Sequence, residues 1–160
     1  MPEEEKNEAQ KTSDIPFAHL HVHTEFSLLD GASRIPELIA TTKAAGMDAI
    51  AITDHGAMYG VVDFYKEAIA QGVKPVIGCE VYVAPGDRKE RAEVNGVKYY
   101  HLILLAENQE GYRNLVKLVS YANIEGFYYK PRVDHELLRK YHEGIICLSA
   151  CVAGEVPRAL

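Results

Sequence analysis

Residues 48–56 read DAIAITDHG, a short apolar run followed by polar residues. A short apolar run of this kind is typical of a strand buried in a parallel sheet. The run ends directly in Asp54, His55 and Gly56. In parallel α/β folds, ligand-binding residues collect at the carboxyl ends of the strands. The stretch therefore predicts an α/β protein whose functional site lies just beyond its strand ends.

The neighbouring segments alternate between helix and strand signals. Around residues 35–45, Pro36 suits the first turn of a helix and Gly46 suits its end. This alternation predicts about five parallel strands with flanking helices, either as a complete open domain or as part of a barrel. The expected strands are 17–23, 48–53, 75–83, 99–106 and 144–149; the expected helices are 35–45, 59–70, 110–121 and 134–141, with Asp134 as a cap, and a hairpin turn is expected at Asn95-Gly96.

Composition and charge limit the class of protein. The chain has 160 residues, 48% of them hydrophobic and 25% charged, which is typical of one soluble globular domain. The net charge of −6 argues against a surface that coats nucleic acid, and no apolar run approaches the roughly 18 residues of a membrane span. Residues 1–16 are polar and acidic, so we expect a disordered leader there and one domain over 17–160. The three cysteines favour a reduced, cytoplasmic setting.

Alternating histidines mark the first expected strand, where single apolar residues separate His19, His21 and His23. Because strand side chains alternate between faces, the three imidazoles are expected to project from one face. Neutral imidazole is a ligand for Zn, Mn or Fe, so the motif indicates a metal site; the alternative is chance clustering on an exposed strand. After the second strand, Asp54 could cap the following helix, whereas His55 has no evident structural role.

Single polar residues occur in or after the other expected strands. Glu80 lies within an apolar run, where a carboxylate is costly unless it binds metal or forms a buried salt bridge. His101 is either a ligand or a hydrogen-bonded core histidine, and Cys151 is either a thiolate ligand or a small buried hydrophobe. Asp30 and the glycine after it, taken alone, form a turn. The combination favours one metal site, with candidates His21, His23, His55, Glu80, His101 and Cys151.

The candidate ligands and the residues around them make the sequence resemble the PHP domain family of metal-dependent phosphoesterases. The metal motifs that carry the resemblance are HVHTEFS at 21–27 with Asp30-Gly31, TDHG at 53–56, GCE at 78–80 and the strand that contains His101. The connecting segments are similar to the version of this domain found in bacterial replicative DNA polymerase III alpha subunits. Those segments are SLLDGA at 27–32, KPVIGCEVY at 74–82, GYRNLV at 111–116 and SAC at 149–151.

The resemblance implies a distorted (β/α)7 barrel, incomplete in this chain, with up to three divalent metals (Zn, Mn or Fe) at the strand ends. The implied ligands are His21, His23 and Glu80 for one metal, Asp30 and His55 for a second, and Glu80, His101 and Cys151 for a third. Glu80, His55 and His101 would lie at the reacting centre, the histidines as ligands rather than acid–base groups. His19 would orient a ligand. The family's last Asp-x-His motif and an Mg-dependent polymerase core would lie beyond residue 160.

Three functions follow as alternatives. The first is a metal-dependent 3′–5′ exonuclease that proofreads within a replicative DNA polymerase, with DNA and other polymerase subunits as partners and no membrane. The second is a structural or docking module that braces the polymerase. The third, a stand-alone phosphatase, is disfavoured because the connecting segments are polymerase-like. On its own the chain is expected to expose the edge of its last strand and to be marginally stable, oligomeric or swapped.

The expected loop 126–132, GFYYKPR, places aromatic side chains beside two cations, Lys130 and Arg132. Such a loop could stack a nucleic-acid base and hold a phosphate. The alternative, which the sequence favours, is a packed loop whose charges are simply solvated.

Overall fold

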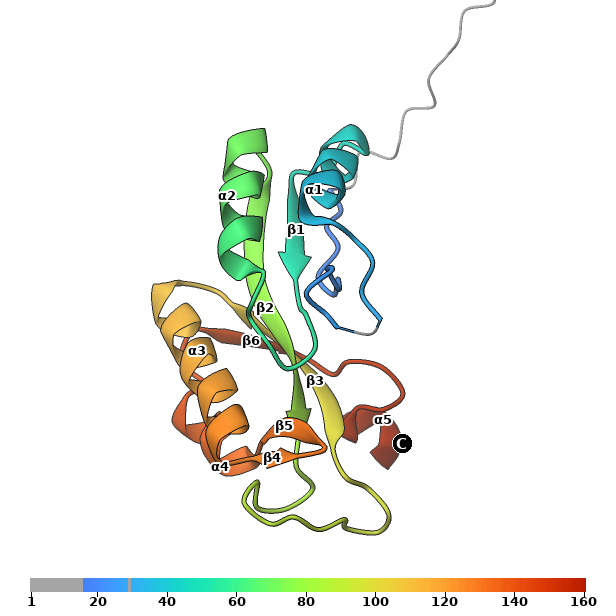
Figure 1. Ribbon diagram of the computed structural model, residues 1–160, viewed down its shortest axis with the longest axis vertical. Coiled ribbons are helices and arrows are strands. Elements are labelled where there is room, and N and C mark those ends of the chain that lie inside the picture. The colour runs from blue at the N-terminus through green and yellow to red at the C-terminus, as the bar shows by residue number, and fades with distance from the viewer. Residues whose placement is uncertain (1–15, 29) are drawn as a thin grey trace, which may run out of the picture.

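The computed structural model describes residues 16–28 and 30–160, so the expected leader at 1–16 lies outside it except for Pro16 (Figure 1). The elements, in chain order, are α1 (Ile35–Ala44), β1 (Ala49–Ile52), α2 (Val61–Gln71), β2 (Lys74–Val83), β3 (Tyr100–Ala106), α3 (Gln109–Ile124), β4 (Phe127–Tyr128), β5 (Lys130–Val133), α4 (His135–Lys140), β6 (Ile145–Leu148) and α5 (Glu155–Ala159). The α/β class is confirmed, and so are the four expected helices. Asp134 caps α4 as expected, with its carboxylate accepting from the Leu137 N–H at 2.9 Å.

The long strand β2 is the centre of a six-stranded sheet. On one edge of β2, β1 pairs in parallel with its first part, from Ala49↔Lys74 to Ile52↔Ile77. Further along the same strand, β5 pairs in parallel at Tyr82↔Arg132. On the other edge lies β3, followed by β6.

The expected parallel direction is wrong for part of this sheet. β3 runs antiparallel to β2, β6 runs antiparallel to β3, and β4 runs antiparallel to β5. Parallel neighbours need a crossover that is usually helical, but residues 84–99, all of which the structure describes, contain no helix. They contain instead the expected turn, with positive φ at Asn95 (54°) and Gly96 (76°). The chain therefore returns directly beside the strand it has left.

Residues 17–23, expected as a strand, form only an extended segment beside β1. The His19 carbonyl accepts from the Ala51 N–H at 2.8 Å, and the Val22 carbonyl accepts from the Thr53 N–H at 2.9 Å. The Val22 N–H donates to the Thr53 side-chain oxygen at 2.8 Å rather than to a backbone carbonyl. Because a side chain replaces part of the ladder, a single parallel bridge, His19↔Ile50, is what remains of the expected pairing.

A third difference lies at 126–132, where the expected loop is a short hairpin. Phe127 pairs with Pro131 and Tyr128 with Lys130. Tyr129 alone forms the tip of the hairpin, with a φ of +59°. A tight turn with a bulky residue in the left-handed region has no glycine or asparagine signal, so sequence rules do not find it.

The core has two main parts, one along the first part of β2 and one along its last part. In the first, α1 and α2 cover β1 with buried residues such as Ile39, Ile50 and Phe64. In the second, Leu115 and Leu118 of α3 pack on the end of β2. Figure 1 shows α2 and α3 along the same side of β2. The sheet is thus held from outside by helices, while its other face carries the polar residues described below.

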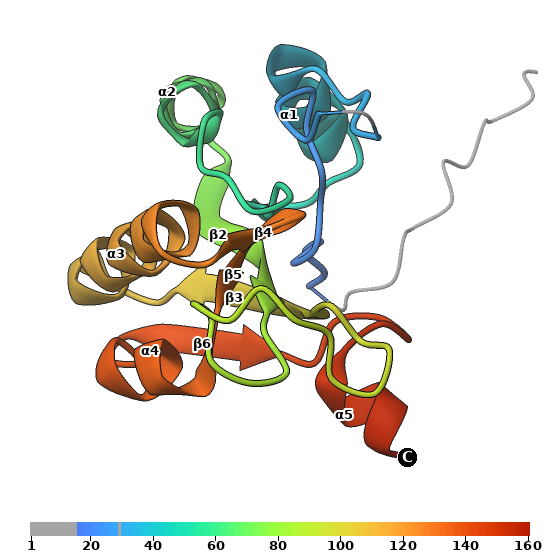
Figure 2. The same ribbon diagram turned by 60° about the horizontal axis from the view of Figure 1, so that its bottom comes forward.

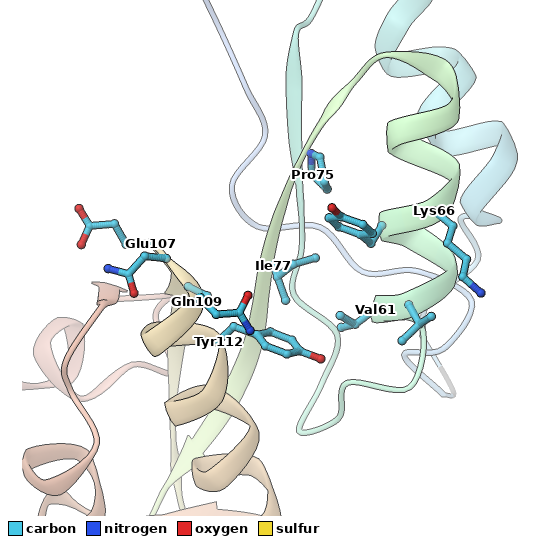
Figure 3. Close-up of a pocket in the computed structure, with 11 residues that line it drawn as sticks. Val61, Lys66, Pro75, Ile77, Glu107, Gln109 and Tyr112 are labelled. Atoms are coloured by element: carbon cyan, nitrogen blue, oxygen red, sulfur yellow. The ribbon is translucent and has the colours of Figure 1, made fainter.

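A hollow of about 470 Å³ separates α2 from the start of α3 and is open to solvent (Figure 3). Val61, Ile77 and Tyr112 are among its lining residues. None of the metal-ligand candidates lines it, so the hollow is distinct from the candidate site. Within the part of the chain that the structure describes, no helix combines the length and the apolar character needed to cross a membrane.

Candidate metal centre

Glu80 is the centre of a cluster of histidines. Its side chain is 2% exposed, although it is a carboxylate in the middle of β2. One carboxylate oxygen, Oε2, lies 2.7 Å from His21 Nε2 and 3.0 Å from His23 Nε2. The other, Oε1, lies 2.6 Å from His101 Nδ1 and 3.5 Å from His55 Nδ1. The two oxygens therefore face two different groups of imidazoles, which is the arrangement that a bridging carboxylate requires.

The backbone fixes His55 beside Glu80. The Glu80 N–H donates to the Asp54 carbonyl at 3.1 Å, and the Gly56 N–H donates to the Glu80 carbonyl at 2.8 Å. Gly56 has a φ of +59°, and a Cβ atom there would lie 2.8 Å from Pro131 Cγ. Only glycine fits this turn, so the chain leaves β1 with the His55 imidazole directed at the carboxylate.

Asp54 anchors the segment that carries His21 and His23. Its carboxylate accepts from the Thr24 N–H at 2.6 Å and from the Thr24 hydroxyl at 2.8 Å, and both residues are buried. The expectation that Asp54 caps the next helix is wrong, since Gly60 is the N-cap of α2 and no side chain caps it. The helix begins too far from Asp54, and the carboxylate is used to hold the histidine segment instead.

Ser27 connects two of the imidazole-bearing segments. Its hydroxyl oxygen lies 3.1 Å from His23 Nδ1 and accepts from the His55 N–H at 3.1 Å. Ser27 is fully buried. A ring nitrogen held in this way leaves Nε2 of His23 free to face Glu80, which is how metal-binding histidines are commonly oriented.

Asp30 and Cys151 lie at the two ends of the cluster. Asp30 Oδ2 is 2.7 Å from His55 Nε2, while His55 Nδ1 is buried and has no hydrogen-bond partner within the described residues. At the other end, Cys151 Sγ lies 3.8 Å from His101 Nδ1 and accepts from the Ala153 N–H at 3.5 Å. All seven candidate ligands thus lie along one series of contacts, and the ligand atoms of His21, His23 and Glu80 lie within 4.8 Å of one another; the seven are His21, His23, Asp30, His55, Glu80, His101 and Cys151.

The charges of the cluster shift the pKa values of two of its members. Burial alone would raise the pKa of the Glu80 carboxyl, but hydrogen bonds from His101, His23, His55 and His21 outweigh burial and hold the pKa well below its usual range. The adjacent Glu80 carboxylate raises the pKa of the His55 imidazole above its usual range; burial opposes this shift and the charge of Asp30 adds to it. Glu80 is therefore an anion at any physiological pH, ready to pair with cations.

The donor set fits divalent metal ions. His21 Nε2 and His23 Nε2 are 3.1 Å apart, close to the roughly 3.3 Å that separates two nitrogen ligands of one tetrahedral zinc ion. With Glu80, they form a group whose ligand atoms all lie within 4.8 Å of one another. His55 Nδ1 is buried and its nearest carboxylate oxygen, Glu80 Oε1, is 3.5 Å away, which leaves the nitrogen without a well-formed hydrogen bond among the described residues. Imidazole, carboxylate and thiolate together suit zinc or a similar transition metal.

Three residues near the cluster differ from the roles that the sequence predicts, and Tyr82 is a neighbour of the cluster that the sequence analysis does not name. His19, expected to orient a ligand, is exposed, and its ring packs edge-on against Phe17 at 4.9 Å. Ser27 was visible only as part of a motif, and Asp54 was assigned a different role. Tyr82 lies 5.4 Å from the His101 ring and could have been found by strand alternation, because it stands two residues after Glu80.

Known proteins similar to this chain belong to the family that the sequence motifs resemble. Residues 19–160 match the model of the PHP domain family. The chain is 57% identical over 147 residues to the DNA polymerase III subunit alpha of Treponema pallidum (strain Nichols), which covers 91% of this chain and 13% of that protein. It is 50% identical over 145 residues to the DNA polymerase III subunit alpha of Borreliella burgdorferi, covering 90% of this chain and 13% of that protein.

The chain thus spans only 13% of the length of these two relatives. Among solved structures, an amidohydrolase from Chromobacterium violaceum, described with bound sulfate and no metal, is similar with a TM-score of 0.48 and 23% identity. That alignment covers 66% of this chain and 32% of the amidohydrolase.

Proposed function

The chain belongs to the PHP domain family, and from this premise we propose that its histidine cluster is a metal-dependent phosphoesterase site. The observation that carries the proposal is the division of Glu80 between two groups of imidazoles, of which His21 and His23 lie close enough to Glu80 to share one metal ion. If Glu80 formed only a buried salt bridge, one cationic partner would be sufficient for its carboxylate. Four imidazoles around one carboxylate are better explained by shared cations.

The protein's own residues would hold and orient the metals. His21 and His23 would bind with Glu80 Oε2, Asp30 and His55 would contribute to a second site, and His101 and Cys151 would bind with Glu80 Oε1. Bound divalent cations would stabilise the negative charge that develops on a phosphoryl group and lower the pKa of a bound water. Asp54 and Ser27 would keep the imidazoles in place, so that little reorganisation is needed when substrate binds.

We further propose that the domain works inside a replicative DNA polymerase and cleaves DNA from its 3′ end. This rests on the names of the relatives, DNA polymerase III subunit alpha, and on the high identity over most of the present chain. In that setting the partners are DNA and the other polymerase subunits, and a separate Mg-dependent centre would catalyse polymerisation. A reducing, cytoplasmic location agrees with three free cysteines.

The test is hydrolysis of a 3′-labelled single strand by the intact protein, purified with Zn or Mn, together with measurement of its metal content. The His21→Ala plus His55→Ala variant should lose both metal and the release of labelled nucleotide. His142→Ala, an exposed histidine that contacts the Arg139 carbonyl, is the matched control. Equal hydrolysis by the wild-type and double-variant proteins would eliminate the phosphoesterase. Bound metal without any hydrolysis would instead leave a metal-dependent structural module.

A further inference from the structure

The tip of the β4–β5 hairpin presents an aromatic side chain at a local energetic cost. Tyr129 has a φ of +59°, in the left-handed region that favours glycine, and its side chain is 63% exposed. Phe127, in the same hairpin, is 52% exposed. Because the ring is exposed, its burial contributes little free energy to offset the backbone strain. Strain at such a residue indicates a functional role for the side chain.

The hairpin borders a hollow with cationic and aromatic walls. Arg91, Phe127, Tyr128 and Tyr129 line a space of about 350 Å³. Lys98 Nζ stands 4.1 Å above the centre of the Tyr129 ring, and Glu93 lies 3.4 Å from the same Nζ. Figure 2 shows the connection 84–99, which carries Arg91 and Lys98, beside β4 and β5. Proteins that bind single-stranded nucleic acid commonly combine aromatic rings with cations, because the bases stack on the rings and the cations contact the phosphates.

Lys130, the residue after Tyr129 in the hairpin, lies near the metal cluster through the ring of Tyr82. Lys130 Nζ is 5.5 Å from the centre of the Tyr82 ring, and the Tyr82 ring is 6.1 Å from His55 and 5.4 Å from His101. Behind them, Gly56 touches Pro131, so the hairpin rests directly on the turn that carries His55. The cation of Lys130 is therefore separated from two imidazoles of the cluster by the Tyr82 ring alone.

We propose that the β4–β5 hairpin and Lys98 form a binding site for single-stranded nucleic acid that leads into the metal cluster. One base would enter the hollow against Tyr129, and Lys130 and Lys98 would hold the phosphates on the way to Glu80. The inference deepens the proposed phosphoesterase function, on which it rests, by naming a substrate contact. Arg132 has no part in it, because its buried guanidinium already donates to the carbonyls of Gly126, Arg88, Glu90 and Lys98.

The variant Tyr129→Gly tests the proposal without endangering the fold. Glycine suits a φ of +59°, so the variant should unfold at the same or a higher temperature than the wild type. The KM for a 3′-labelled oligothymidylate should nevertheless rise roughly fivefold or more, the usual loss when one base–aromatic stack is removed. Lys130→Ala should raise KM as well, with a weaker dependence on salt. Tyr65→Ala, an exposed tyrosine on α2, should leave KM unchanged.

A local readout separates this site from other nucleic-acid sites of a larger protein. An oligothymidylate that contains 4-thiothymidine, irradiated with the intact protein, should crosslink to the peptide containing 127–130, and Tyr129→Gly should abolish that adduct. The same crosslink should persist in His21→Ala plus His55→Ala, where hydrolysis is lost. Hydrolysis by the wild type, with no adduct at 127–130 and an unchanged KM in Tyr129→Gly and Lys130→Ala, would overturn the inference and leave the phosphoesterase intact. An adduct in a protein that never hydrolyses DNA would overturn the phosphoesterase instead.

Discussion

His101 Nδ1 lies 2.6 Å from Glu80 Oε1, although the two residues are not partners in the β2–β3 ladder. His101 is paired with Tyr82, and Glu80 is paired with Ile103, so the contact is a diagonal one across the sheet. The diagonal contact directs Oε1 towards β3 and leaves Oε2 for the histidines that precede β1. The position of the Glu80 carboxylate between two groups of imidazoles thus follows from the antiparallel register of β2 and β3.

Glu80→Gln is expected to reduce the affinity of the protein for Zn or Mn at least about tenfold, because the amide keeps the shape but removes the charge and one acceptor oxygen. Competition with a chelating dye measures the dissociation constants. Glu37→Gln, which changes a carboxylate that is 73% exposed on α1, is the matched control and should bind metal like the wild type. Unchanged metal affinity in Glu80→Gln would mean that Glu80 is only a salt-bridge partner of the histidines.

Ser27→Ala is expected to weaken metal binding by about 10- to 100-fold, the usual effect of removing the partner of a ligand imidazole. The hydroxyl touches both His23 Nδ1 and the His55 N–H, so its loss frees one ring and leaves one buried backbone donor unpaired. Titration with Mn or Zn gives the affinity. Ser120→Ala removes a hydroxyl that donates to the Val116 carbonyl on α3 and should have no effect on metal. Normal affinity in Ser27→Ala would show that backbone anchoring by Asp54 is sufficient.

The sequence predicted which side chains lie close together in the cluster more accurately than it predicted the directions of the strands. His55, Glu80 and His101 could be placed because each interrupts or follows an apolar strand, which is a local signal. The direction of β3 could not be predicted in this way, because it depends on the absence of a helix from 84–99 and on where the returning chain finds free backbone groups. Likewise the anchoring role of Asp54 depends on Thr24, which is 30 residues earlier in the chain. Contacts of this range leave no periodic pattern.

Asp134→Asn should destabilise the protein in a pH-dependent manner. Burial would raise the pKa of this carboxyl, but the N–H groups of Leu137 and Arg88 and the Arg88 guanidinium, 2.9 Å away, lower it overall. A depressed folded-state pKa stabilises the protein at pH values above the unfolded pKa of about 4, and the stabilisation is lost as the pH falls through the lower folded value. Asparagine can still cap α4 through its oxygen, but its NH2 group then faces two Arg88 donors, so the loss, about 1–3 kcal/mol at pH 7, reports the charge together with these two hydrogen bonds.

Urea unfolding of the wild type and Asp134→Asn between pH 7 and pH 3 measures the difference, which should shrink as the pH decreases. Asp63→Asn, in the first turn of α2 and exposed, serves as the control and should cost less than about 0.5 kcal/mol at every pH. A difference that grows towards acid pH would contradict the assigned ion pair.

Gly111→Ala should destabilise the protein, although alanine is favoured over glycine in helices by about 1 kcal/mol. Gly111 is buried in the first turn of α3, and an added Cβ would lie 1.7 Å from the Gly144 carbonyl oxygen, which is backbone and cannot move aside as a side chain would. We therefore expect a net loss of about 3 kcal/mol in the free energy of unfolding, measured by urea titration. Gly86→Ala is the matched control, because the nearest atom to its new Cβ is 4.0 Å away, and it should change the stability by less than about 0.5 kcal/mol. A stabilising Gly111→Ala would mean that helix propensity outweighs packing here and that α3 does not approach the start of β6 so closely.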